Sequence, residues 1–286
     1  MAFENPDLSG QTAFITGTTR GVGKAFALSL AECGCNIVST GKTSESDAYG
    51  EQKDLEGSIE QTAREVRERG AEAISIQLNV REAEEVEAAV ERTVNEFGGI
   101  DVCINNAGAI QMATVEEMPA DRFDLMTDVN VRGAYVTARQ VLPHLKESGG
   151  HILFNSPPNV LQSAPGKAAY SWSKQGMTFV AKSLAEEVSG YGVGVNAVWP
   201  VTALDTRATR YFGMGTEDDW RSPEILADAV LELISRDPDD CTGNAFYDEE
   251  LLREAGVTDF SPYNLTEGEP APLSAQIFDP TFERPA

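Results

Sequence analysis

Short apolar runs alternate with amphipathic helical patterns along most of the chain. The clearest helical pattern covers residues 82–97, where Val86, Val90 and Val94 recur on one face and glutamates fill the other. The apolar runs between such patterns have the length of buried strands. Strands that alternate with helices are typical of an open parallel sheet covered on both faces. We therefore predict a doubly wound α/β fold of about seven strands in a single domain.

The same pattern gives the extent of each predicted element. We predict strands at residues 11–16, 36–40, 73–78, 101–104, 150–155, 193–198 and 242–247, and helices at 22–32, 59–69, 82–97, 120–147, 169–190, 222–234 and 249–255.

Three segments lie outside this pattern. Residues 41–58 are polar and rich in small side chains, which predicts a flexible loop beside a ligand site. Residues 201–220 carry four large apolar side chains, Tyr211, Phe212, Met214 and Trp220. We interpret this segment as a mobile lid over an apolar substrate, or as an aromatic cluster under a loop. After a domain of residues 1–260, residues 261–286 lack periodicity, so we expect an irregular tail that is disordered or laid along a neighbouring subunit.

Three glycines, Gly17, Gly21 and Gly23, stand between the first predicted strand and the first predicted helix. Glycines in such a turn let the backbone bend tightly and let a pyrophosphate approach the N–H groups at the positive end of the helix. The G-x-x-x-G-x-G spacing is a variant of the dinucleotide fingerprint. Its position favours a dinucleotide site in a Rossmann-like fold over a tight turn without a ligand.

The end of the second predicted strand lacks the acidic residue that holds the ribose 2′-hydroxyl of NAD. Lys42 stands there instead, and Arg20 lies within the glycine turn. Either cation alone would be a solvated surface charge, but the pair suits a 2′-phosphate. We therefore predict NADP as the cofactor, with NAD as the alternative.

Polar residues also follow later strands. The sequence Asn105-Asn106-Ala107-Gly108 places amides and small residues at a strand end, where a dinucleotide can pass close to the backbone. Ser156 follows the strand at 150–155, which exposes its hydroxyl at the edge of the sheet where ligands of doubly wound folds bind. Asn130 lies within a predicted helix although asparagine is a poor helix former, and on position alone we interpret it as structural.

Tyr170 and Lys174 lie four residues apart in a predicted helix, so their side chains share one face. A phenol has a pKa of about 10, and a neighbouring ammonium favours the phenolate and lowers that pKa. The pair would suit the transfer of a proton to or from a carbonyl oxygen. The spacing alone occurs on many solvated helices, so this hypothesis depends on the residues predicted around it.

The composition is strongly acidic, with 46 Asp and Glu against 22 Lys and Arg and a net charge of -24. This charge argues against nucleic acids and anionic membranes as partners, and it suggests adaptation to a salty cytosol or a surface kept acidic for solubility. The four cysteines lack C-x-x-C spacing and only two histidines occur, so we expect a cytoplasmic protein with reduced thiols and no metal site. We find no membrane span and no signal peptide in the sequence.

The glycine turn is followed in order by Asn105-Asn106-Ala107-Gly108, Asn130, Ser156, Tyr170 and Lys174. With these features in this order, the sequence resembles the short-chain dehydrogenase/reductase family from about residue 8 to about residue 247. Four further segments resemble one branch of this family, the hydroxysteroid dehydrogenase-like branch. They are Gly41-Lys42-Thr43, Asn155-Ser156-Pro157-Pro158, Asn196-Ala197-Val198-Trp199-Pro200 and Thr242-Gly243-Asn244. Longer members of that branch append a sterol-carrier domain, which this sequence does not include.

The resemblance implies a role for each matching residue. Tyr170 would be the general acid/base, and Ser156 would bond the substrate oxygen. Lys174 would lower the pKa of Tyr170 and hold the nicotinamide ribose, while Asn130 would anchor a water for the proton relay. The helices at 120–147 and 169–190 would form the contacts of a homodimer or homotetramer. We expect cofactor contacts at Gly17, Thr19, Arg20, Gly21, Val22, Gly23, Lys42, Asn79, Val80, Asn106, Ala107, Gly108, Tyr170, Lys174, Pro200 and Thr202.

The sequence departs from the family pattern in three places. Asn79 stands where the family usually has an aspartate that contacts the adenine of the cofactor, and this change should weaken contacts to the adenine ring. Val201 replaces the glycine after Pro200, so we expect a changed loop on the nicotinamide side. Pro157 and Pro158 remove two backbone donors beside the catalytic serine and reshape the substrate pocket.

We therefore predict an NADP-dependent oxidoreductase that moves hydride between the nicotinamide and a carbonyl or secondary alcohol of an apolar, lipid-like or acyl substrate. The cofactor supplies the hydride and the protein supplies placement and electrostatics. One alternative is a 3-oxoacyl reductase of fatty-acid metabolism. The other is an NADP-binding scaffold or sensor without turnover.

Overall fold

A single parallel sheet forms the centre of the protein in the computed structural model, which describes residues 5–45, 57–160, 162 and 164–284. The strands follow the order β3-β2-β1-β4-β5-β6-β9, and all neighbours are parallel. They are β1 (Thr12–Thr16), β2 (Asn36–Gly41), β3 (Ala73–Gln77), β4 (Val102–Asn105), β5 (Gly150–Asn155), β6 (Val193–Trp199) and β9 (Ala245–Tyr247). The strand order reverses beside β1, as in doubly wound sheets, so the predicted Rossmann-like α/β fold is confirmed.

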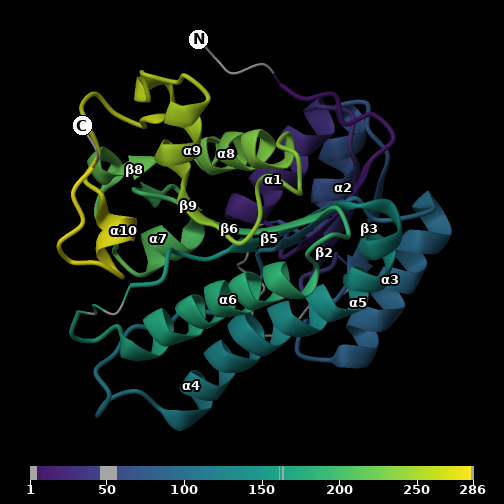
Figure 1. Cartoon of the computed structure of the whole chain (residues 1–286). Coiled ribbons are helices and arrows are strands. Elements are labelled where there is room, and N and C mark those ends of the chain that lie inside the picture. The colour runs from purple at the N-terminus through teal and green to yellow at the C-terminus, as the bar shows by residue number, and fades with distance from the viewer. Residues whose placement is uncertain (1–4, 46–56, 161, 163, 285–286) are drawn as a thin grey trace.

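Helices cover both faces of this sheet (Figure 1). One layer contains α1, α2 and α8, and the other contains α3, α5 and α6. The α-helices of the described residues are α1 (Gly21–Glu32), α2 (Ile59–Glu68), α3 (Ala83–Phe97), α4 (Ala120–Met126), α5 (Ala134–Ser148), α6 (Ala168–Glu187), α7 (Arg207–Tyr211), α8 (Glu224–Ile234), α9 (Asp248–Glu254) and α10 (Leu273–Gln276). Each face of the sheet has its own apolar core, with Phe26 fully buried in one and Phe154 in the other.

The helix predicted at residues 120–147 is divided by a π-helical segment. α4 leads into η1 (Thr127–Gly133), which continues into α5. Gly133 lies so close to Val80 that a Cβ at this glycine would be 2.7 Å from a Val80 methyl group. Single π-helical turns inside α-helices frequently occur at functional sites, and η1 contains Asn130.

The predicted lid at residues 201–220 consists of several short elements. It contains β7 (Ala203–Leu204), α7 and η2 (Glu217–Asp219), and it ends at β8 (Trp220–Arg221), which pairs with β7 in a small separate sheet. The predicted loop at residues 41–58 falls largely on residues 46–56, which lie outside the described residues.

The C-terminal segment folds back onto its own chain. It contains η3 (Ser261–Tyr263) and α10, and Figure 1 shows α10, in yellow, on the side of the molecule where α6 begins. Ile277 and Phe278 are buried there. The prediction of a disordered tail was wrong for residues 261–284, whereas contact of this segment with a neighbouring subunit stays a prediction. The apolar side chains of this segment find a core within the same chain, and burial of each such side chain is favourable.

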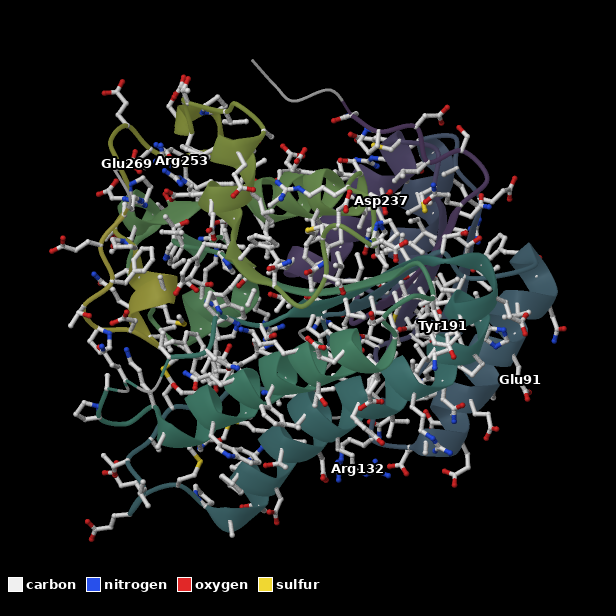
Figure 2. The ribbon with its side chains drawn as sticks, in the orientation of Figure 1. Glu91, Arg132, Tyr191, Asp237, Arg253 and Glu269 are labelled. Atoms are coloured by element: carbon white, nitrogen blue, oxygen red, sulfur yellow. The ribbon has the colours of Figure 1, made fainter. Side chains whose placement is uncertain are left out.

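The acidic side chains on α3 point into solvent, as Glu91 shows (Figure 2). The four cysteines are unpaired and buried. In the described ranges, no helix combines the length and the apolar character that crossing a bilayer requires.

Candidate active site

One face of α6 carries two of the residues predicted for catalysis. Tyr170, Lys174 and Thr178 follow one another at four-residue spacing, and all three are buried. Side chains at this spacing lie on one face of a helix. α6 therefore aligns three polar groups against the carboxyl end of β5, where Asn155 and Ser156 lie.

Lys174 is held by the main chain at the end of β5. Its Nζ donates to the Asn155 carbonyl oxygen at 2.8 Å, and the Asn155 side chain donates to Asn106 Oδ1 at 3.0 Å. Asn106 Nδ2 in turn donates to the carbonyl oxygens of Thr16 and Gly17, at 3.0 Å each. A continuous chain of hydrogen bonds thus connects Lys174 with the glycine turn, so the two parts of the candidate site are positioned together.

Asn130 connects the loop after β4 with α6. Its Oδ1 accepts from the Ala109 N–H at 2.7 Å, and its Nδ2 donates to the Ala109 carbonyl and to Ser173 Oγ, both at 2.9 Å. The Ser173 hydroxyl donates to the Tyr170 carbonyl at 2.8 Å. These bonds give Asn130 the structural role that its position suggested, directly beside the backbone of Tyr170. Its role as a water anchor stays a prediction.

Ser156 is fully buried, and its hydroxyl is held by α6. Thr178 Oγ1 lies 2.8 Å from Ser156 Oγ and 2.6 Å from the Pro157 carbonyl oxygen. A carbonyl oxygen can only accept and threonine has one hydroxyl proton, so Ser156 supplies the proton of one bond when both form. Sequence reasoning missed Thr178, because its contact with Ser156 joins residues 22 positions apart and no spacing rule indicates it.

Burial governs the ionisation of Tyr170 and Lys174. Loss of contact with water raises the pKa of the Tyr170 hydroxyl above its ordinary value and lowers the pKa of Lys174 to about 7. The sequence analysis predicted that Lys174 lowers the pKa of Tyr170, and the direction found is the opposite. Desolvation disfavours both charged forms, and the Lys174 Nζ is directed at the Asn155 carbonyl. Tyr170 is therefore a neutral phenol, the form that can give up a proton.

The glycine turn packs tightly against the loop after β4. Gly17 and Gly21 have positive φ angles of 78° and 55°. A Cβ at Gly23 would lie 2.2 Å from the Gly17 carbonyl oxygen, and one at Gly17 would lie 3.0 Å from the Ala107 Cα. Only glycine meets these requirements, and the resulting turn precedes the N-terminus of α1 as a pyrophosphate site requires. Val22, in the first turn of α1, packs partly buried against the core.

The residues expected on the nicotinamide side fit a dinucleotide. Thr202 is fully buried, and its Oγ1 is among the buried side-chain atoms of the described residues that have no hydrogen-bond partner. A buried hydroxyl without a partner indicates a place for a polar ligand group. A Cβ at Gly108 would lie 3.5 Å from Asn130 Oδ1 and 3.6 Å from Lys174 Nζ, so a glycine keeps the approach to the lysine open.

The loop that follows Pro200 is held by the C-terminal part of the chain. Pro200 is buried. The Val201 N–H donates to Asp248 Oδ1 at 2.9 Å, and the Val201 carbonyl accepts from the Ala275 N–H at 3.1 Å. Both partners lie beyond the residues from which the cofactor site was predicted. The loop that lacks the family's glycine is therefore fixed by contacts the sequence did not indicate.

The two cations predicted for a 2′-phosphate, Arg20 and Lys42, lie in or near the glycine turn. Gly41, which precedes the exposed Lys42, packs so closely on Thr19 that a Cβ there would be 3.0 Å from the Thr19 methyl group. Burial lowers the pKa of Arg20, and the charge of Arg207 at the start of α7 lowers it further. Two guanidinium groups that repel each other in this way favour an anion beside them. Sequence reasoning did not identify Arg207.

Asn79 and Val80 lie in the turn between β3 and α3. Asn79 Oδ1 accepts from the Arg81 N–H at 3.3 Å, and the Asn79 N–H donates to Glu85 Oε2 at 2.8 Å. Val80 is buried against Gly133. The structure thus gives both residues a local structural role, and their contacts with an adenine stay a prediction.

An apolar cluster surrounds Tyr170. It contains Met126, Trp199, Ile277 and Phe278. The Phe278 ring centroid lies 6.0 Å from that of Tyr170 and 5.3 Å from that of Trp199. The rings of Phe278 and Trp199 are edge to face. A polar proton donor inside an apolar wall is typical of a site for an apolar ligand.

An open apolar cavity of about 470 Å³ adjoins this cluster. Residues 113–123 and the first turns of α6 line it, and Phe123 and Trp172 stack there with ring centroids 5.6 Å apart. Met118 and Ala169 belong both to the cavity lining and to the side chains that pack against the Tyr170 cluster. The cavity therefore adjoins the cluster that contains Tyr170, through these two side chains.

The four apolar side chains of the predicted lid have different environments. Met214 packs against the Tyr170 cluster, and its carbonyl accepts from the Trp220 Nε1 at 2.7 Å. Trp220 is buried, whereas Tyr211 and Phe212 are exposed and contact each other edge to face. Met214 is thus the member that reaches the site, and the mobility of this segment stays a prediction.

The fold and these residues define a Rossmann-like protein in which a buried tyrosine–lysine pair lies next to a dinucleotide cradle. A family model described as short chain dehydrogenase matches residues 11–214. The chain belongs to the short chain dehydrogenase family, whose members are NAD(P)-dependent oxidoreductases.

Curated relatives and solved structures agree with this assignment. Hydroxysteroid dehydrogenase-like protein 2 of Xenopus tropicalis is 41% identical over 267 residues, which cover 92% of this chain and 62% of that protein. The Homo sapiens protein of the same name is 39% identical over the same shares. The chain therefore spans less than two thirds of these relatives.

Two crystal structures are also similar. A short chain dehydrogenase homologue from Mycobacterium thermoresistibile matches with a TM-score of 0.84 and 38% identity, over 92% of this chain and 94% of that one. A protein from Xanthomonas campestris, provisionally described as a dehydrogenase, matches with a TM-score of 0.85 and 36% identity over 99% and 100%.

Proposed function

We propose that this protein is an NADP-dependent oxidoreductase. It transfers hydride between the nicotinamide and a carbonyl or secondary alcohol of an apolar, lipid-like or acyl compound. The observation that carries the proposal is the buried pair Tyr170 and Lys174, which the hydrogen bonds through Asn155 and Asn106 connect to the glycine turn. A proton donor and a dinucleotide cradle held by one network suit hydride transfer coupled to proton transfer.

Tyr170 gives its hydroxyl proton to the carbonyl oxygen as the bond order of the carbonyl falls. The raised pKa of Tyr170 keeps it protonated at neutral pH, which favours its role as an acid in the reductive direction. In the oxidative direction Tyr170 must become a phenolate, and a protonated Lys174 one turn away stabilises that charge. The cofactor supplies or accepts the hydride when bound.

Ser156 bonds the same substrate oxygen and places it next to Tyr170. The hydroxyl that would do this is at present held by Thr178, at 2.8 Å. Rotation of the Ser156 side chain toward the substrate exchanges one hydrogen bond for another, which is a small change in free energy. Thr178 therefore serves as a resting partner that sets the position of Ser156.

The NADP preference is supported by the cations around the glycine turn. Arg20 and Lys42 come from the two segments that meet at Thr19 and Gly41. Arg207 adds a charge close enough to affect the pKa of Arg20. A 2′-phosphate would accept charge-assisted hydrogen bonds from these cations, whereas the 2′-hydroxyl of NAD carries no charge and would gain less from them.

Titration of NADPH and NADH by fluorescence tests the cofactor proposal. We expect NADPH to bind at least about 10-fold more tightly than NADH, because a phosphate surrounded by cations gains charge-assisted hydrogen bonds. Arg20→Ala and Lys42→Ala should reduce the affinity for NADPH and leave that for NADH nearly unchanged. Equal affinities for the two cofactors in the wild type would contradict the proposal.

Screening of substrates separates the alternatives. Reduction of β-keto thioesters but not of simple ketones would favour a 3-oxoacyl reductase. Tight NADPH binding without turnover of any carbonyl would favour the scaffold or sensor. Reduction of apolar ketones that is lost in the Tyr170→Phe variant would support the proposed activity.

We also propose that the protein forms a homodimer or homotetramer through α5 and α6. Tyr135 on α5 and Phe179 on α6 are 55% and 70% exposed, which is unusual for large aromatic side chains. Light scattering at several concentrations would measure the oligomeric state, and a monomer at micromolar concentration would contradict this part of the proposal.

A further inference from the structure

The C-terminal segment of residues 264–284, here called the strap, lies directly against the candidate active site. The Ala275 N–H bonds the carbonyl of Val201, in the loop after β6. Phe278 is fully buried and contacts the rings of both Tyr170 and Trp199. The strap is therefore part of the wall around the reacting groups.

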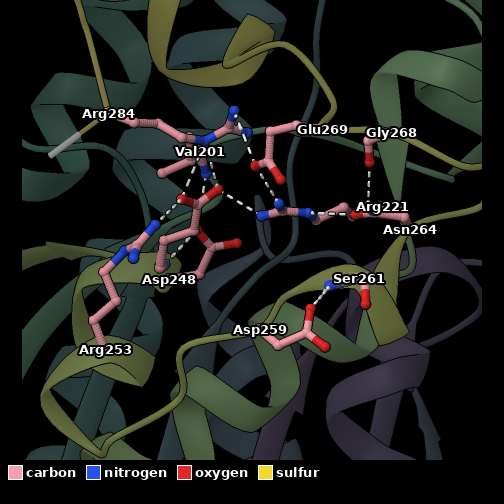
Figure 3. Close-up of polar contacts among 11 residues, drawn as sticks. Val201, Arg221, Asp248, Arg253, Asp259, Ser261, Asn264, Gly268, Glu269 and Arg284 are labelled. Atoms are coloured by element: carbon pink, nitrogen blue, oxygen red, sulfur yellow. Dashed lines mark hydrogen bonds and ion pairs between the residues drawn. The ribbon is translucent and has the colours of Figure 1, made fainter. Parts of the chain in front are cut away.

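An ionic cluster, here called the latch, holds the strap in place (Figure 3). Its Arg221 and Glu249 are buried, whereas the side chain of Glu269 is 60% exposed. Arg221 is fully buried, and it bonds Glu249 Oε1 at 2.5 Å, Glu269 Oε1 at 2.7 Å and Asn264 Oδ1 at 2.9 Å. Arg284 spans the same two carboxylates, at 3.0 Å from Glu249 and 3.1 Å from Glu269. The latch thus ties the strap to the domain near both ends, through Asn264 and Glu269 at one end and Arg284 at the other.

We propose that Phe278 determines substrate specificity by limiting the size of the substituent on one side of the reacting carbonyl. The inference rests on the proposed function and identifies the substrate class of that site. The substrate is a carbonyl compound with one small substituent, such as a methyl group, toward Phe278. Its other substituent is long and apolar and lies in the cavity that adjoins the Tyr170 cluster through Ala169 and Met118.

Packing explains why Phe278 excludes large groups. Its ring has no exposed surface and contacts two other rings, so an additional methylene on that side must displace a close-packed wall. Displacement of the wall also pulls on the strap, which the latch resists. The open cavity beside Trp172 has about 470 Å³, within the range of ligand pockets, and receives an alkyl chain without such displacement.

Two isomeric ketones, 2-decanone and 5-decanone, test this inference because they have the same size and hydrophobicity. We expect the wild type to reduce 2-decanone with a kcat/KM at least about 10-fold higher than that for 5-decanone, since one methylene in an apolar pocket is worth about 10–200-fold. Phe278→Ala should bring the ratio close to one, mainly by raising kcat/KM for 5-decanone. Phe278→Leu should give an intermediate ratio.

Phe282→Ala is the matched control, because Phe282 lies on the same strap but contacts Tyr247, with ring centroids 4.8 Å apart. It should leave the ratio unchanged. An unchanged ratio in Phe278→Ala, an equal change in Phe282→Ala, or a wild type without preference would each overturn the inference. A wild type that reduces other carbonyls but neither decanone would also overturn it.

Thiol labelling tests the position of Phe278 without turnover, so it remains informative if the protein reduces no carbonyl and the proposed function itself fails. The native cysteines are all buried, so a maleimide reacts with an introduced thiol. Phe278→Cys should react at least about 10-fold more slowly than Glu283→Cys, because labelling requires the strap to open locally. Addition of Arg284→Ala should accelerate labelling of the Phe278→Cys variant. Equal rates, or no acceleration without Arg284, would contradict a latched wall.

Discussion

Thr178 Oγ1 lies 2.8 Å from Ser156 Oγ, and this contact joins the end of β5 to the face of α6 that carries Tyr170 and Lys174. The same Thr178 oxygen lies 2.6 Å from the Pro157 carbonyl. One threonine thus positions the hydroxyl that is expected to hold the substrate oxygen and the backbone that follows it.

We expect Thr178→Val to lower kcat by about 10- to 100-fold, because a small misplacement of a catalytic group has effects of this size. Thr178→Ser retains the hydroxyl and should restore most of the activity. Steady-state kinetics would show whether kcat falls with little change in KM, as expected for a positioning residue. A Thr178→Val enzyme with wild-type kcat would contradict this role.

Lys174 should take up a proton when the cofactor binds. Burial lowers the pKa of this lysine to about 7, so at pH 8 most of the cofactor-free protein has a neutral amine. Bonds from the ammonium to a ribose, close to a negatively charged pyrophosphate, would raise the pKa again. Calorimetry in buffers of different ionisation enthalpy should show proton uptake at pH 8 and much less at pH 6.

Lys174→Met is the control for this measurement, and it should bind cofactor without the pH-dependent proton uptake. The same uptake in that variant would assign the proton to another group. A wild type without uptake at pH 8 would show that the lysine keeps one protonation state throughout binding.

Asp248 should make the stability of the protein depend on pH. Burial raises its pKa from 3.8 to about 7, while the bond from the Val201 N–H opposes the shift. The folded form therefore binds the proton more tightly than the unfolded form. The stabilisation from this proton is complete below pH 4 and is lost as the pH rises to about 7.

Asp248→Asn should not show this loss, because an amide does not ionise. From pH 5 to pH 8 the free energy of unfolding of the wild type should fall relative to that of the variant by on the order of 2 kcal/mol. Urea denaturation at both pH values measures the difference. Parallel pH profiles for the two proteins would contradict the assignment.

Salt should stabilise the protein because its net charge is -24. The Debye length falls from about 10 Å at 0.1 M to about 3 Å at 1 M salt, which weakens the repulsion among acidic side chains. We expect the Tm to rise by about 5 °C or more between 0.1 and 2 M KCl. Sucrose at matched osmolality serves as a control, since it does not screen charges. An unchanged Tm in KCl would favour an acidic surface that serves solubility alone.

The parts of the site that the sequence predicted depend on local patterns. The turn containing Gly17 and Gly23 follows from strand–glycine–helix order, and the shared face of Tyr170 and Lys174 follows from helical spacing. The seven-stranded sheet follows from the alternation of apolar runs and amphipathic helices. Each turn, strand and helix is indicated by a pattern of a few residues, and the sheet follows from the order of these elements along the chain.

The parts that the sequence did not predict depend on contacts between distant residues. Phe278 reaches Tyr170 from 108 positions further along the chain, and no periodicity in the C-terminal segment indicates that contact. The raised pKa of Tyr170 results from burial by such segments, so spacing alone gave the wrong direction. The π-helical turn around Asn130 likewise ends where Gly133 closely approaches Val80, a residue distant in the sequence.

The rate of ketone reduction by the Tyr170→Phe variant tests the central claim most directly. Phenylalanine keeps the ring that packs on Phe278 and removes only the hydroxyl, so the fold and cofactor binding should persist. We predict that kcat for 2-decanone falls by about 10²- to 10⁴-fold while the affinity for NADPH, measured by fluorescence, changes little. A variant that reduces the ketone at the wild-type rate would contradict the account.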